Sequence, residues 1–203
     1  MEDYKNEVTL RGTIVSLVNT RQGTTVTIVS RNGDVKNYPP VKFTPSVDLS
    51  GYKINDQVVI FGFSQNHTIQ RNNGKKGSHT VIIGEEIHKA KRLLSDYFPE
   101  EDFPENGGYA NDINDVIFIG DVIAVYVKDE TKDFAIVKAE CKGSEHKGQC
   151  DMSCFARLSA IAKELKPGDK VAMIGFVSTK SENVNGNMVN LSNVVCKDIC
   201  KIS

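Results

Sequence analysis

Three segments of the first half of the chain return in the same order in the second half. The offsets between partners are 108, 113 and 108 residues, so changes in length are confined to the intervals between the matched segments. An ordered repeat of this kind indicates duplication of one domain, which limits the fold to two copies of one architecture. The matched pairs are NEVTLRGTIVSLV (Asn6 to Val18) with NDVIFIGDVIAVY (Asn114 to Tyr126), DQVVIFGF (Asp56 to Phe63) with DKVAMIGF (Asp169 to Phe176), and TVIIGEEIHK (Thr80 to Lys89) with MVNLSNVVCK (Met188 to Lys197).

Each copy has the composition of a β domain. Val, Ile and Thr crowd short runs bounded by turn residues, and five such strands can be counted per copy. In the second copy, RLSAIAKELKPGD (Arg157 to Asp169) has apolar residues at helical spacing and ends at Pro-Gly, which predicts a short helix. The matching interval of the first copy, Thr44 to Asp56, lacks that period, so we expect a loop or a single turn there.

Three strands, a helix and two strands is the order of the OB-fold, a small Greek-key barrel. We therefore expect an all-β protein with two tandem five-stranded OB-fold Greek-key barrels, the second having a short helix between strands 3 and 4. Residues 93–115 hold seven acids and no base, together with two prolines and a Gly-Gly pair. This composition predicts OB-fold domain 1 over 1–92, an acidic linker over 93–113, and OB-fold domain 2 over 114–203.

The second copy resembles bacterial single-stranded DNA-binding proteins (SSBs). NDVIFIGDVIAV is similar to their opening strand, and CDMSCFARLSAIAKELKPGDKVAMIGFVSTK (Cys150 to Lys180) is similar to their third strand, helix and fourth strand. The resemblance implies a tandem OB-fold variant of that family. It would bind single-stranded DNA with little sequence preference, in DNA replication, recombination or the transfer of a mobile element. Asp121 departs from the pattern, since SSBs commonly have a basic residue there.

An OB barrel binds single strands by following the phosphates with Lys and Arg and by stacking bases on aromatic rings. The hairpin SQNHTIQRNNGKKGSHT (Ser64 to Thr80) has three basic residues, two histidines and no acid. It predicts that the first copy binds more strongly, with a merely solvated tip as the alternative. We expect the aromatic rings on the strands to divide between core and stacking positions. The candidate nucleic-acid-binding residues are Arg11, Arg21, Tyr38, Lys42, Phe43, His67, Arg71, Lys75, Lys76, His79, Tyr126, Lys138, Phe155 and Lys180.

Other chemistry has weaker support in the sequence. Cys141, His146, Cys150 and Cys154 have spacings unlike those of a zinc knuckle, so we expect reduced thiols and no metal or other cofactor. No phosphate-binding loop, HExxH or nucleophile elbow is present, so we expect no enzyme. The polar start of the chain and the absence of a long apolar run predict a cytoplasmic protein with no membrane partner.

The fourth strand of each copy is apolar on both faces, which predicts that a second barrel or a second chain covers one of them. Single-stranded DNA is the expected partner. A homodimer and contacts with replication or recombination proteins stay open. Two alternative functions also stay open: an OB-fold interaction scaffold of a replication complex, and an RNA-binding OB module.

Overall fold

The computed structural model of the chain describes residues 4–32, 35–70, 76–90, 112–127, 129, 131–143, 146–184 and 187–202. The chain forms two compact units. Unit 1 comprises Met1–Glu7, Ser64–Val81 and Asp115–Ser203, and unit 2 comprises Val8–Phe63 and Ile82–Asn114. Apart from residues 112 and 113, the predicted acidic linker lies outside the described residues.

Strands dominate both units, as the runs of Val, Ile and Thr predict. In chain order the elements are β1 (Lys5–Thr20), β2 (Gly23–Asn32), β3 (Val35–Asn37), β4 (Pro40–Phe43), β5 (Gln57–Gln70), β6 (Lys76–Lys89), β7 (Asn114–Tyr126), β8 (Phe134–Cys141), β9 (Gly148–Phe155), α1 (Arg157–Glu164), β10 (Lys170–Val184) and β11 (Asn187–Lys201).

In unit 2, five strands close into a barrel. β1 pairs antiparallel with β2 and β5, β2 pairs with β4, and β4 meets β6 in parallel. The neighbouring β5 and β6 complete the ring. The interval between β4 and β5 contains turns and no helix, which confirms the expectation for Thr44 to Asp56.

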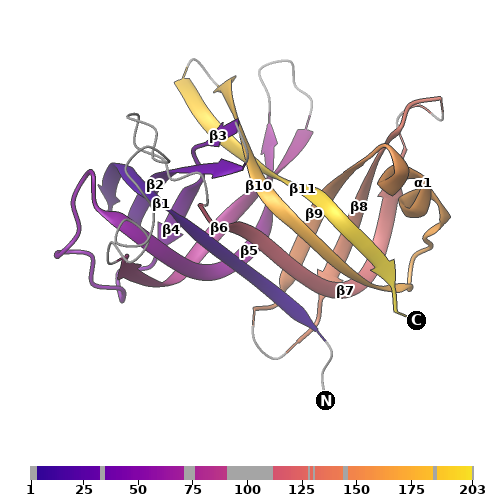
Figure 1. Ribbon diagram of the computed structural model, residues 1–203, viewed down its shortest axis with the longest axis horizontal. Coiled ribbons are helices and arrows are strands. Elements are labelled where there is room, and N and C mark those ends of the chain that lie inside the picture. Colours follow the sequence, from indigo (N-terminus) through magenta and orange to yellow (C-terminus); the bar gives the residue numbers. More distant parts are fainter. Residues whose placement is uncertain are drawn as a thin grey trace, which may run out of the picture. The chain divides into compact units, whose positions relative to one another are not determined.

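Unit 1 contains a second barrel with the same order of paired strands. β7 pairs antiparallel with β8 and β10, β8 pairs with β9, β10 pairs with β11, and β9 meets β11 in parallel. α1 lies between β9 and β10 in the sequence and packs on β8, β9 and β11, as Figure 1 shows for this unit. Its buried positions are Ser159 and Ala162, and the turn at Pro167 and Gly168 follows it. The two OB-fold barrels and the short helix of the second barrel are therefore confirmed.

Alternating burial along the strands builds both barrel cores. Val8, Leu10 and Ile14 point inward from β1, and Val116 and Phe118 do so from β7. A β-bulge interrupts each of these strands, between Ile14 and Ser16 and between Val122 and Ala124. Because side chains alternate with a period of two, the extra residue reverses which positions face outward beyond the bulge.

Glycines allow neighbouring strands to approach closely at matched positions of the two barrels. A Cβ on Gly62 would collide with the carbonyl of Ile83, and a Cβ on Gly175 would collide with that of Val195. These two glycines occupy equivalent places in the duplicated fourth strand. Close approach of the backbones at these two places therefore requires a glycine.

A buried asparagine ties three pieces of unit 1 together. Asn6 is 1% exposed. Its Nδ2 donates to the carbonyls of Ser64 (2.9 Å) and His146 (3.2 Å), and its Oδ1 accepts from the Ser64 backbone N–H (3.1 Å) and hydroxyl (2.9 Å). Buried polar groups stabilise a fold only when they are satisfied, and this asparagine is satisfied at both ends of its amide.

Candidate nucleic-acid interface

The outer side of β7, β8 and β9 in unit 1 carries a cluster of partly exposed rings. Antiparallel partners point to the same side of a sheet. Tyr126 on β7 is paired with Ile136 on β8, and Ile136 is paired with Ser153 on β9. The next residue of β8 on the same side is Phe134, which is paired with Phe155 on β9. We call the surface formed by these five residues the aromatic face.

Two rings of the aromatic face are available to a ligand. Tyr126 is 53% exposed and Phe155 is 50% exposed. The rings of Phe134 and Phe155 lie with their centroids 5.0 Å apart and their planes tilted by 42°. A tilted contact at this distance is favourable for an aromatic pair and holds each ring in place. The cluster therefore offers exposed ring surface that includes one packed pair of rings.

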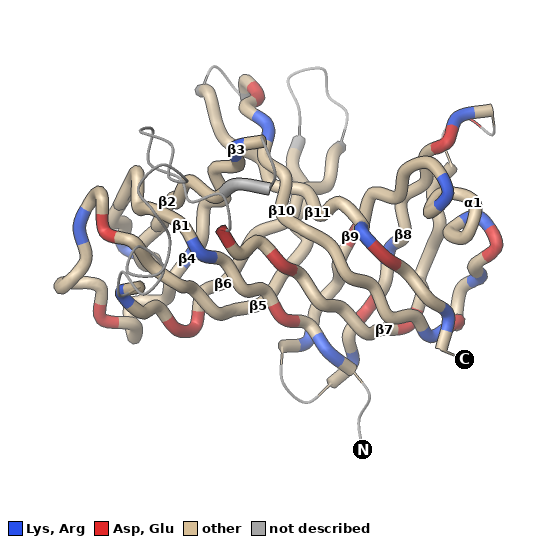
Figure 2. Tube along the Cα trace, in the orientation of Figure 1, with Lys and Arg blue, Asp and Glu red and all other residues tan. Residues whose placement is uncertain are grey.

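The charges beside the aromatic face are mixed. Lys138 lies on the same side of β8, directly opposite Asp151 in register. Asp121 is paired in register with Glu140 and accepts hydrogen bonds from Lys142 Nζ (2.8 Å) and the Tyr4 hydroxyl (2.9 Å). In Figure 2, both acidic and basic positions occur along the described strands of unit 1.

The ion pair at Asp121 shifts the pKa of both partners. The hydrogen bond from Lys142 lowers the pKa of Asp121, and the same contact raises the pKa of Lys142. The pKa of Tyr4 is raised, first by its hydrogen bond to Asp121. The ammonium of Lys170 lies 4.1 Å from the centre of the Tyr4 ring. The carboxylate that departs from the SSB pattern is thus offset by two lysines within its own unit.

The corresponding surface of unit 2 is built from smaller side chains. Its outer rows are Val18, Thr25 and Lys42, and then Ser16, Thr27 and Pro40. Lys42 is exposed on β4, and Arg21 is exposed in the turn between β1 and β2. At these register positions of unit 2 there is no aromatic ring. This surface presents the ammonium group of Lys42, hydroxyl groups, and the apolar side chains of Val18 and Pro40.

The remaining predicted residues of the first copy fall in different environments. Arg11 is partly buried on β1, and Tyr38 is exposed between β3 and β4. Phe43 requires a correction: it is 2% exposed, and its ring packs against Gly84 inside the barrel. Lys42 faces outward on the short strand β4, so Val41 and Phe43 on either side of it face inward. Phe43 therefore belongs to the core and cannot stack on a base.

The basic hairpin is described only in part. Arg71 and Lys75 lie outside the described residues, as does the side chain of Lys76, whose backbone begins β6. His67 and His79 face each other near the described end of the hairpin, with ring centroids 6.0 Å apart. These residues belong to unit 1 although they come from the first copy of the repeat. Stronger binding by the first copy remains a prediction.

Lys180 is exposed on β10 in unit 1, with its ammonium 3.8 Å from the Glu182 carboxylate.

Among the predicted residues, the structure brings Tyr126, Lys138 and Phe155 together on the same side of neighbouring strands. Sequence reasoning missed Phe134 and Ile136 as members of this surface. The sequence alone does not mark them, because the position of Phe134 opposite Phe155 follows from the register of β8 with β9.

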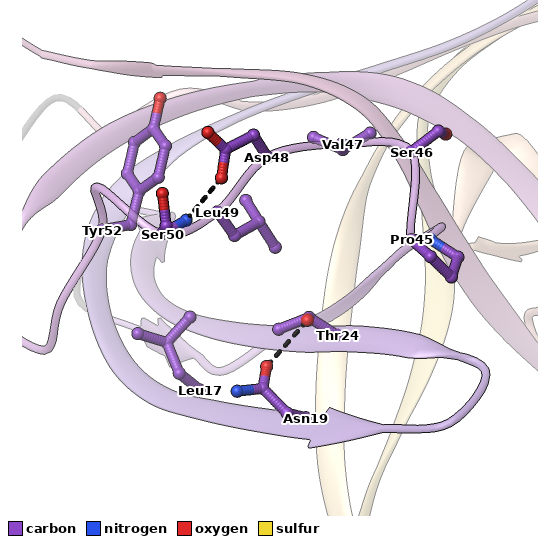
Figure 3. Close-up of a pocket in the computed structure, with 10 residues that line it drawn as sticks. All are labelled: Leu17, Asn19, Thr24, Pro45, Ser46, Val47, Asp48, Leu49, Ser50 and Tyr52. Carbon is purple, nitrogen blue, oxygen red and sulfur yellow. Dashed lines mark hydrogen bonds between the residues drawn. The ribbon is translucent and has the colours of Figure 1, made fainter.

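Unit 2 contains an open cavity of about 480 Å³, shown in Figure 3. It lies between the β1–β2 hairpin and the loop that replaces the helix of unit 1. Its rim is polar, with Asp48 accepting from the Ser50 backbone N–H at 2.9 Å and Thr24 donating to Asn19 at 2.8 Å. Tyr52 is held by donating its hydroxyl to the Ile87 carbonyl at 2.7 Å. The cavity presents no cluster of exposed rings and lacks the features of the aromatic face.

The described residues also bear on metal binding and membrane association. Within the described ranges, no three His, Cys, Asp or Glu side chains come together as a metal site. In that same part of the chain, no helix has the length and apolar character needed to cross a membrane.

The fold has counterparts among solved structures. The wild-type single-stranded DNA binding protein from Thermus aquaticus aligns with a TM-score of 0.67 at 15% identity, over 98% of this chain and 94% of its own. A deletion mutant of that protein aligns with a TM-score of 0.66 at 16% identity, over 100% of this chain and 97% of its own. No protein-family model and no curated protein sequence matches the chain. Both alignments span the two barrels, so the shared feature is the tandem OB-fold itself.

Proposed function

We propose that this protein binds single-stranded DNA with little sequence preference, and that the aromatic face of unit 1 stacks the bases. The observation that carries the proposal is the cluster of Tyr126, Phe134 and Phe155 on the outer side of β7, β8 and β9. Every base has a π-face, so stacking on rings does not discriminate strongly between sequences. The Thermus aquaticus protein with the same fold is named as a single-stranded DNA binding protein, which supports this assignment.

Stacking outweighs ionic contacts on the aromatic face. Each stacked base contributes about 1–3 kcal/mol by substitution measurements on other proteins. The nearby lysines do not provide a comparable gain, because Lys142 already pairs with Asp121 and Lys138 lies opposite Asp151. A phosphate would have to compete with these carboxylates. Phosphate contacts are therefore made mainly by exposed basic side chains elsewhere in the protein. The candidates are Arg21, Lys42 and the basic hairpin.

The biological setting proposed for this activity is DNA replication, recombination or the transfer of a mobile element. In each of these processes single strands are exposed and need a protein that covers them irrespective of sequence. Replication or recombination proteins would then be the protein partners.

Fluorescence anisotropy with labelled oligonucleotides tests the proposal. A thymine 30-mer, the matching RNA and a 30-base-pair duplex should be titrated with the full chain at several salt concentrations. We expect the single-stranded DNA to bind most tightly and mixed-sequence strands to bind within a small factor of it. Tighter binding of RNA would favour the RNA-binding module. A folded protein that binds no strand even at low salt would favour the interaction scaffold.

A further inference from the structure

Two buried thiols meet across the seam that closes the barrel of unit 1. β9 and β11 run parallel there, with Met152 paired to Val194 and Ser153 paired to Val195. The next residue on each strand is a cysteine, so the same register places Cys154 beside Cys196. Both side chains are buried and both thiols are free.

The spacing at this position suits a disulfide. Adjacent strands lie about 4.7–4.9 Å apart, and the Cα atoms of disulfide-bonded cysteines are usually about 4.4–6.8 Å apart. The two residues are level in a parallel pair and both face the barrel interior, so their Cβ atoms lie on the same side. A small local approach brings these atoms within about 3.5–4.5 Å of each other, as a disulfide requires. A bond between the two sulfur atoms needs no change of strand register.

The two thiols already interact. Their mutual hydrogen bond lowers the pKa of Cys154 and raises the pKa of Cys196. The Cys196 thiol also lies 3.2 Å from the Asp198 carbonyl. Since the thiolate is the nucleophile in sulfur chemistry, Cys154 is the partner that reacts first. Cys150, on the same strand, differs: burial raises its pKa to about 12 and keeps it a protonated thiol.

We propose that Cys154 and Cys196 form a redox modification site, in which hydrogen peroxide converts the two thiols into an intramolecular disulfide. The Cys154 thiolate attacks one peroxide oxygen, the O–O bond breaks, and a sulfenic acid and hydroxide form. Cys196 then attacks the Cys154 sulfur, the S–O bond breaks, and the oxygen leaves as water. In total, two thiols lose two electrons and two protons, and one peroxide is reduced to two waters.

Peroxide reaches the pair through opening of the seam. Only two register pairs join β9 to β11 among the described residues, whereas β10 and β11 share a long antiparallel ladder. A short ladder opens more readily than a long one, which gives a small oxidant access to buried sulfur. Once formed, the disulfide covalently joins the strands at the point where the barrel closes. It therefore restricts the unfolded chain and stabilises unit 1.

Peptide mapping of the oxidised full-length chain tests this site. The protein should be treated with hydrogen peroxide, alkylated under denaturing conditions, and digested without reductant. We expect a peptide pair linked through Cys154 and Cys196, lighter by ~2 Da than the two reduced peptides together, and released by dithiothreitol. The melting temperature of the oxidised protein should rise by roughly 5–15 °C, the range for a disulfide closing a loop of this length.

Matched variants separate this pair from the other cysteines. Cys150→Ser and Cys200→Ser should keep the linked peptide, while Cys154→Ser and Cys196→Ser should lose it. Should a serine variant fail to fold, mapping of the wild-type protein decides the question alone. The proposal is overturned if Cys154 and Cys196 stay alkylatable after oxidation, if either bonds to a different cysteine, or if oxidation stops at a sulfinic acid. DNA binding enters none of these measurements, so the result stands apart from the proposed function.

Discussion

Replacing Phe155 by Leu tests the aromatic face most directly. Leucine keeps an apolar side chain at the position but removes the ring on which a base would stack. A stacked base contributes about 1–3 kcal/mol, and 1.4 kcal/mol corresponds to a tenfold change in affinity. We therefore expect Kd for a thymine oligonucleotide to rise by roughly 5- to 140-fold. Because the ring carries no charge, the slope of log K against log salt should stay unchanged.

The same substitution has a limited cost in stability. Phe155 is 50% exposed, so about half of its area is buried on folding, and leucine keeps part of that burial. The further loss is its contact with Phe134, whose ring centroid lies 5.0 Å away. Such aromatic pairs contribute about 0.5–1.5 kcal/mol beyond their burial. The melting temperature should fall by a few degrees, and the variant should be fully folded at 25 °C. Any large loss of binding then reports on the interface.

Phe61→Leu is the matched control. Phe61 is 42% exposed and has an edge contact with His88 at 6.1 Å, so it loses a comparable ring pair. It lies on β5 of unit 2 and is not part of the aromatic face. Anisotropy titrations at three salt concentrations, with thermal melts of each variant, compare the two changes. A folded Phe155→Leu protein that binds like the wild type, or like Phe61→Leu, would refute base stacking at this face.

Three further predictions address other contacts. Changing Arg71, Lys75 and Lys76 together to Ala should flatten the salt dependence of single-strand binding by about 2 units of slope, at roughly 0.7 per lost phosphate contact; an unchanged slope in a salt titration places the phosphates elsewhere. Asn6→Ala leaves the buried Ser64 donors without their acceptor and should lower the free energy of unfolding by about 2–4 kcal/mol in urea titrations, and a loss below about 0.5 kcal/mol would contradict this. Asp121→Asn should destabilise the protein at neutral pH. The pKa of Asp121 in the folded protein lies below its usual 3.8. The difference in melting temperature between the variant and the wild type, measured across pH 2–7, should therefore shrink as the pH falls below 3.8. A constant difference would exclude the Lys142 pair as its cause.

The fold was predictable because its signals are local. Val, Ile and Thr runs define the strands, the helical spacing in Arg157 to Glu164 defines the helix, and the order of these elements selects the OB-fold. The inward position of Phe43 was also within reach. It alternates with Lys42 on a short strand, so only one of them can face solvent.

The aromatic face was harder to predict, because a bulge determines it. Before the bulge in β7, the even-numbered residues Val116 and Phe118 point inward, and continuing that alternation would place Tyr126 in the core. The extra residue between Val122 and Ala124 reverses the pattern, so Tyr126 points outward beside Ile136. A period of two read from the sequence carries no mark of this change. The cross-strand neighbours of Phe155 follow only from the paired register.

The make-up of unit 1 has a consequence for how the repeat can change over time. Its barrel uses the second copy of the repeat, but Asn6 and Ser64 come from the first, and the N-terminal segment contributes Tyr4 as well. A gene cut back to the second copy would lose all of these partners at once and leave their contacts unfilled. Exchange of parts between copies of this kind makes a duplication difficult to reverse. Selection on the codons for Tyr4 and Asn6 therefore acts on a barrel encoded mostly by the second copy.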